Sequence, residues 1–125
     1  MAKNESGSQI NEVSRIAEGT VVKGSLASEY DIRIDGTFEG DLLTKGKLVV
    51  GNNAHIKGNI VCDTADIWGR VEGELVTAGV TSFKSVASFM ANLKTSRIAI
   101  EMGAIFNGTC KIITDEEFAT LSNQA

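Results

Sequence analysis

A seven-residue pattern occurs six times along this 125-residue chain, and no other feature restricts the fold as strongly. The clearest copy is Gly36-Thr-Phe-Glu-Gly-Asp-Leu42, and the other copies begin at Thr20, Ala54, Gly69, Ala87 and Ala104. The intervals between successive starts are therefore 16, 18, 15, 18 and 17 residues. Such a short and regular interval predicts an array of stacked β-coils.

Within each copy the side chains alternate with the period of two that a β-strand requires. The third position of each copy predicts one core column: Val22, Phe38, Ile56, Val71, Phe89 and Phe106. The seventh position predicts another: Leu26, Leu42, Ile60, Leu75, Leu93 and Cys110. The fifth position is glycine in every copy except one, where Ala91 stands. This column indicates either an interior with no room for a side chain or a bend in the backbone.

The spacing varies because the corners between the strands differ in length. Three residues separate Val50 from Ala54, whereas one residue separates Ile34 from Gly36 and Ile67 from Gly69. With 42% apolar residues and no proline, the chain is typical of a single domain with unbroken strands. We predict a polar, flexible N-terminal tail over 1–13 and a β-helix over 14–113. The segment 114–125 begins with Thr114-Asp-Glu-Glu117, whose capping-box form predicts a short helical cap.

Composition and motifs exclude several classes of function. The net charge of −4 argues against a nucleic-acid partner. We find no catalytic triad, paired carboxylates or phosphate-binding loop, so we expect no catalytic residue, cofactor or metal site. His55 is interpreted as a solvated strand residue, and Cys62 and Cys110 as buried free thiols of inward columns. Without a signal segment or a long apolar run, the chain is predicted to be cytoplasmic.

The two ends of the array are the predicted functional surfaces. A terminal coil presents unpaired backbone N–H and C=O groups and the open face of its apolar columns. We therefore expect end-to-end stacking into filaments. Trp68, Met90 and Ile105 are predicted to point outward and to contact a partner or a lateral neighbour. For Trp68, a ring that lies over neighbouring corner residues is the preferred interpretation, and contact with a partner or a lateral neighbour is the alternative.

Two segments carry a resemblance to a known family. The first is Ile32-Arg-Ile-Asp-Gly-Thr-Phe-Glu-Gly-Asp-Leu42. The second is Leu48-Val-Val-Gly-Asn-Asn-Ala-His-Ile-Lys-Gly-Asn-Ile60. Over roughly residues 10–113 the chain resembles the bactofilins, bacterial cytoskeletal proteins. The resemblance implies a right-handed, three-sided parallel β-helix of about six coils. It also implies nucleotide-independent assembly into filaments that lack polarity, and a role in localising cell-wall-modifying enzymes that set cell shape.

The resemblance further implies a polymerisation interface at the terminal coils, and the matching residues are Val22, Leu26, Ile100 and Phe106. It implies self-association and partners among inner-membrane or peptidoglycan-modifying proteins at the cytoplasmic face of the inner membrane. Bactofilins are often attached there through the N-terminal tail. The tail of this chain lacks an apolar or basic opening, which argues against direct lipid binding.

Two other functions remain open at this point. A left-handed β-helix acyltransferase has coils of similar length, but it requires an aliphatic residue at every sixth position. Here the alternation is unbroken from Ile32 to Leu42, and no histidine lies in a protruding loop. A monomeric β-solenoid adaptor would use the same rod as a binding surface.

Overall fold

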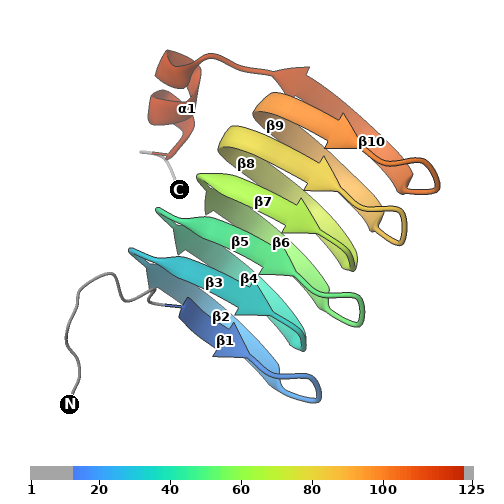
Figure 1. Ribbon diagram of the computed structural model, residues 1–125. Helices are drawn as coiled ribbons and strands as arrows, with labels where there is room; N and C mark the ends of the chain where they lie inside the picture. The colour runs from blue at the N-terminus through green and yellow to red at the C-terminus, as the bar shows by residue number, and fades with distance from the viewer. Residues whose placement is uncertain (1–12, 123–125) are drawn as a thin grey trace, which may run out of the picture.

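Parallel strands stacked into six coils make up nearly all of the computed structural model, which describes residues 13–122 (Figure 1). Each of the first four coils combines a short strand with a long one, and in the last two coils the end of β8 or of β9 takes the place of the short strand. The elements are β1 (Val13–Ile16), β2 (Val21–Ser28), β3 (Asp31–Ile34), β4 (Thr37–Thr44), β5 (Lys47–Val50), β6 (His55–Cys62), β7 (Thr64–Ile67), β8 (Arg70–Phe83), β9 (Ser88–Ile100), β10 (Ile105–Ile112) and helix α1 (Asp115–Ser122). Of the predicted N-terminal tail, only Val13 lies within the described residues.

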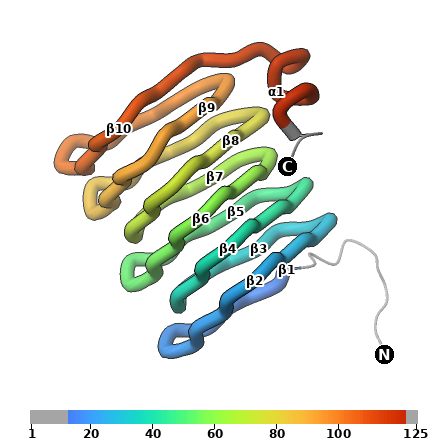
Figure 2. Tube along the Cα trace, turned by 180° about the vertical axis from the view of Figure 1, so that it is seen from behind, coloured from blue at the N-terminus to red at the C-terminus, as the bar shows by residue number. Residues whose placement is uncertain are grey.

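The strand register confirms the alignment of all six copies. The long strands pair in the order β2, β4, β6, β8, β9 and β10, the face that Figure 2 shows in front. In this register Val22 pairs with Phe38, and Phe89 with Phe106. The short strands β1, β3, β5 and β7 form the opposite face, which the last residues of β8 and β9 continue. β8 and β9 therefore each serve two successive coils.

The coils ascend from β1 to β10 as a right-handed solenoid (Figure 1), so the predicted fold class is confirmed. The glycine column supplies the third side, because each of these glycines has a positive φ, for example 143° at Gly58. A backbone in this conformation bends the long strand at its middle. At Gly58 there is no room for a side chain either, since a Cβ there would overlap the carbonyl oxygen of Gly40.

The inward columns form one continuous core along the solenoid axis. Phe38, Ile56, Val71 and Phe89 are all completely buried. Burying a side chain of this size contributes about 1.5–3 kcal/mol. At the C-terminal end the column becomes aromatic, and the ring centroids of Phe89 and Phe106 are 5.1 Å apart in a stacked arrangement.

The corners along one edge of the solenoid have two lengths, in the order long, short, long, short, long, long. The residues 17–20, 51–54, 84–87 and 101–104 form four-residue turns, each closed by a backbone hydrogen bond from its last residue to its first, and they project as loops in Figure 1. The corners 35–36 and 68–69 are two residues long. A recess of about 410 Å³, here called the corner notch, lies between the first two long corners. It is lined by Arg15 and Glu18 of coil one, Arg33 and Asp35 of coil two, residues 51–53 of coil three and Trp68 of coil four.

Helix α1 lies beside the solenoid against β8, and it does not extend over β10 (Figure 1). The capping box forms as the sequence indicates, because the Glu117 N–H donates to Thr114 Oγ1 and the Thr114 N–H donates to Glu117 Oε1, both at 3.1 Å. Ile113, immediately before the box, is buried and anchors the turn that leads to the helix. Within residues 13–122, the edge of β10 therefore stays open on the side away from β9.

One of the two predictions for the cysteines is wrong. Cys62 is buried as expected, but Cys110 is exposed. Cys110 does occupy the inward column, since it pairs with Leu93 in the register. Its exposure follows from its place in the last coil, where no further coil covers the column.

Candidate assembly interface

Both ends of the solenoid present strand edges with one partner only. Among the described residues, β1 pairs only with β3 and β2 only with β4. At the other end β10 pairs only with β9, and residues 97–100 of β9 pair only with β8. Each free edge carries backbone donors and acceptors that a further parallel or antiparallel strand can bind.

The apolar columns are buried in the inner coils and partly exposed in the first and the last. Phe38 and Phe89 are 0% exposed, but Val22 and Phe106, at the two ends of their column, are only partly buried. Leu26 behaves in the same way at the end of its own column. Ile100, which ends the column that contains Ile34 and Phe83, is 50% exposed. The four residues predicted for the interface therefore lie in the first and last coils, at ends of the solenoid that no further coil of residues 13–122 covers, and their role in assembly stays a prediction.

Sequence reasoning missed several apolar residues at these ends. Val21 is 61% exposed in the first coil, and Met102 is 95% exposed in the last corner. A signal for Val21 was available, because its column reads Val21, Thr37, His55, Arg70, Ser88 and Ile105. This outward column is apolar only in the two terminal coils, so a comparison of terminal with inner copies would have found it.

Met90 and Ile105 lie on the outer surface, as predicted. Met90 is 42% exposed, and its sulfur is 3.7 Å from a guanidinium nitrogen of Arg70. Ile105 is 52% exposed at the start of β10. Both belong to the last two coils, near the C-terminal end of the solenoid, so an apolar flank adjoins that end. Contact of this flank with a partner stays a prediction.

Trp68 occupies the short corner of coil four and is half-buried. The ammonium group of Lys84 lies 5.3 Å from the centroid of its ring, a distance typical of a cation–π contact. The ring thus lies against a residue of the next corner, and it also borders the corner notch. Whether Trp68 contacts a partner stays a prediction.

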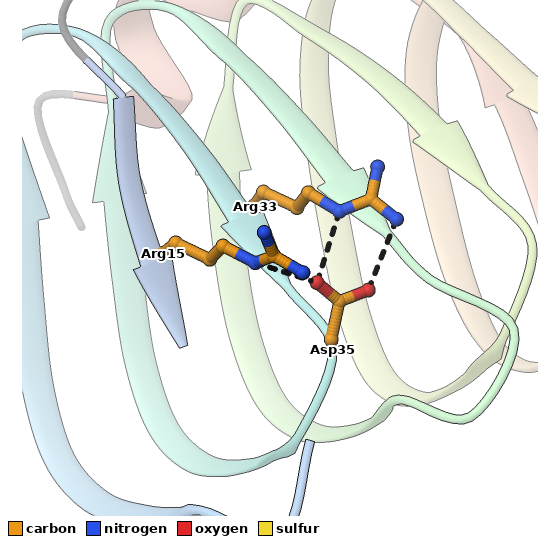
Figure 3. Close-up of polar contacts among 3 residues, drawn as sticks. All are labelled: Arg15, Arg33 and Asp35. Carbon is orange, nitrogen blue, oxygen red and sulfur yellow. Dashed lines mark hydrogen bonds and ion pairs between the residues drawn. The ribbon is translucent and has the colours of Figure 1, made fainter. Parts of the chain in front are cut away.

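Two arginines converge on one carboxylate at the floor of the corner notch (Figure 3). Arg33 donates from Nε and Nη2 to Asp35 at 2.9 and 3.1 Å, and Arg15 donates from Nε at 3.2 Å. The Asp35 side chain is only 16% exposed. The hydrogen bond from Arg33, and to a lesser degree the positive charges of both arginines, lower the pKa of Asp35 below its ordinary value of 3.8.

This lowered pKa predicts a pH-dependent stability. Because the carboxylate is stabilised in the folded state, its contribution is present above pH 3.8 and is lost as the pH falls through the lowered pKa. Asp35→Asn should therefore reduce the free energy of unfolding near neutral pH by up to about 1 kcal/mol, since both guanidiniums are largely exposed. The difference from wild type should disappear in acid. Urea unfolding at several pH values checks this, with Asp63→Asn as the control for loss of an exposed carboxylate.

The single histidine belongs to a polar cluster on the outer surface, which also contains an ion pair between Arg70 and Glu72. His55 Nε2 lies 2.5 Å from Glu72 Oε2, and Arg70 Nε lies 3.2 Å from the same oxygen. The His55 bond is the main reason why the pKa of Glu72 is lowered. The three side chains project from neighbouring strands of one face, and the cluster fits a stabilising role between coils.

No helix within residues 13–122 is long and apolar enough to cross a membrane. Comparison with known proteins gives a consistent result. A family model described as bactofilin, polymer-forming cytoskeletal, matches residues 14–111. Bactofilin BacO of Myxococcus xanthus is 29% identical over 93 residues, which cover 74% of each chain. The chain is also similar to Thermus thermophilus bactofilin, solved by cryo-EM as double helical filaments, with a TM-score of 0.74, 30% identity, and coverage of 78% of this chain and 96% of the other.

Proposed function

This chain belongs to the bactofilin family of polymer-forming cytoskeletal proteins, and we propose that it is a non-enzymatic scaffold whose molecules stack end to end into filaments. The observation that carries the proposal is the change along each apolar column, from fully buried in the inner coils to partly exposed in both terminal coils. A second molecule placed on either end would cover these side chains and pair the free strand edges. Neither gain requires a nucleotide.

The filaments are proposed to lack polarity, so that like ends meet. A contact between two C-terminal ends is isologous, since the same surface is used twice. Val22 and Leu26 would then form one kind of joint, and Ile100 and Phe106 the other. The support is the apolar character of both ends, which lets each end bury its surface against a copy of itself.

Cys110 provides the test of this arrangement, because it is the reactive thiol at the C-terminal end. Burial raises the pKa of the Cys62 thiol to about 12, so Cys62 should not react near neutral pH. A maleimide should label Cys110 readily in an assembly-blocked variant and at least about tenfold more slowly in filaments, where the joint excludes water. Mass spectrometry of the labelled chain measures both rates. Equal rates would place the joint elsewhere, and Cys110→Ser is the control for the site of labelling.

A short bis-maleimide distinguishes the two filament polarities. In a filament without polarity, two Cys110 thiols meet at one joint, and we expect covalent dimers. In a polar filament they are separated by one subunit, about 29 Å for six coils spaced about 4.8 Å apart, which is beyond a short linker. Gel electrophoresis after a treatment long enough for Cys110 to react in filaments gives the answer, and the absence of dimers from filaments whose Cys110 has reacted would contradict like-with-like joints.

We also propose that the filament lies at the cytoplasmic face of the inner membrane and helps to localise cell-wall-modifying machinery. The support is family membership, together with the exposed flank formed by Met90 and Ile105, which remains available beside the joints. Cross-linking in the source cells, followed by recovery of a tagged chain, should yield inner-membrane or peptidoglycan-modifying proteins. Met90→Glu should reduce this yield without loss of filaments.

A further inference from the structure

The corner notch has unused hydrogen-bond donors at its floor. Arg15 binds Asp35 through Nε alone, so both of its Nη groups lack a partner among residues 13–122. The Nη1 group of Arg33 is likewise without one in the described part of the chain. Guanidinium groups bind phosphate and carboxylate groups with several parallel hydrogen bonds. The floor therefore offers donors from two arginines to a single oxyanion.

The two guanidiniums are held in position before any ligand arrives. Asp35 binds both of them, and Gly51 makes room for its carboxylate, because a Cβ there would overlap Asp35 Oδ1. Figure 3 shows both arginine side chains extended toward the same carboxylate from adjacent strands. A side chain that is already restricted loses less conformational entropy on binding, so less of the binding free energy is needed to offset that loss.

The arrangement of charges in the notch also allows an anion to bind. Two guanidiniums face one carboxylate at the floor, and that carboxylate is mostly buried while the arginine side chains are 64% and 45% exposed. The other acid, Glu18, lies on the first projecting corner, where it accepts a hydrogen bond from Asn53 Nδ2 at 3.3 Å. The two arginines and two acids of the lining give a net charge of zero, but the arginine side chains at the floor are more exposed than Asp35 and are the charged groups there that an anion can reach.

The notch is larger than one oxyanion requires, and its remaining walls suit a hydroxylated group. Its volume of about 410 Å³ exceeds that of one oxyanion, and the exposed Asn52 and the half-buried Trp68 are also among the residues that line it. Amides bind hydroxyl groups, and aromatic rings pack against the apolar faces of sugars. We propose that the corner notch binds a small sugar phosphate, with the phosphate on Arg15 and Arg33 and the sugar between Asn52 and Trp68.

Isothermal titration calorimetry of the full chain with glucose 6-phosphate tests the proposal. We expect saturable binding, inorganic phosphate binding about tenfold more weakly, and glucose alone not binding measurably. Because Trp68 is the only tryptophan, a change of fluorescence that saturates at the same concentration would place the ligand in the notch. Absence of heat beyond that of sodium chloride at matched ionic strength would overturn the proposal. Equal binding of inorganic phosphate and glucose 6-phosphate would overturn its sugar part.

Variants assign the contacts. Arg15→Gln should weaken glucose 6-phosphate binding by about tenfold or more, since it removes the charge-assisted hydrogen bonds from this guanidinium to the phosphate. Arg15→Lys keeps the positive charge but loses the planar guanidinium group with its parallel hydrogen-bond donors, so an intermediate affinity is expected. Asn52→Ala should weaken binding of the sugar phosphate but not of inorganic phosphate. Arg97→Gln, an exposed arginine of the last coil, is the matched control. If it weakens binding as much as Arg15→Gln, the effect comes from net charge and the site is wrong.

Discussion

Phe106→Arg should abolish filaments and leave the solenoid folded. Phe106 is partly buried at the C-terminal end, where its ring packs on Phe89 and Phe83. A joint between two C-terminal ends would enclose two guanidiniums without counter-charges, and removing each from water costs several kcal/mol. The critical concentration for assembly should therefore rise by at least about a hundredfold. Negative-stain microscopy and size-exclusion chromatography measure the loss.

The fold should survive this change because only one side of Phe106 touches the core. The free energy of unfolding is expected to fall by about 1–3 kcal/mol. Circular dichroism should show unchanged strand content. Leu43→Arg is the control, since Leu43 is 38% exposed on the outer surface of coil two and lies at neither end. Filaments that persist in Phe106→Arg, or disappear in Leu43→Arg as well, would show that the joint is not where we place it.

Gly58→Ala should destabilise the solenoid more than any other small substitution considered. Gly58 has a φ of 143°, a conformation that costs other residues about 1–3 kcal/mol. Its Cβ would also overlap the carbonyl oxygen of Gly40 in the coil below, and the forced shift costs about 1–3 kcal/mol more. We expect the free energy of unfolding to drop by about 2–6 kcal/mol. Urea unfolding followed by circular dichroism measures the change.

Gly24→Ala separates the cost of the positive φ from the cost of the overlap between coils. Gly24 has a similar φ of 128°, but no atom of the described residues lies within 4 Å of its added Cβ, because Gly24 is in the first coil. It should therefore cost only the conformational part, about 1–3 kcal/mol. Both variants are best measured in the Phe106→Arg background, where assembly does not add to stability. Equal losses at the two positions would mean that overlap between coils contributes nothing.

Most of the fold could be predicted from the sequence because stacking repeats one register. Every coil places equivalent residues on top of one another, so an alignment of the copies already describes the pairing of Phe38 with Ile56. The continuous strands β8 and β9 could not be foreseen, since a strand that turns a corner without a break leaves no clear mark in side-chain alternation. The place of α1 was also out of reach, because it depends on how Ile113 turns the chain.

The candidate interface was only partly predictable. A column shows that Val22 and Phe106 are apolar, but their exposure follows from being in the first and last coils. The same reasoning, applied to Cys110, would have corrected the prediction that its thiol is buried. The corner notch was missed because it depends on the shape of the corners. Arg15 and Arg33 share a column, yet Asp35 meets both only because its corner is short and Gly51 leaves space.

The lateral position of α1 has a practical consequence for any protein attached behind it. Because the chain leaves β10 and turns back beside β8, a domain fused after α1 would project from the side of a filament. A fluorescent label or an enzyme could then be displayed once per subunit, at regular intervals, while the contact between successive molecules remains unobstructed.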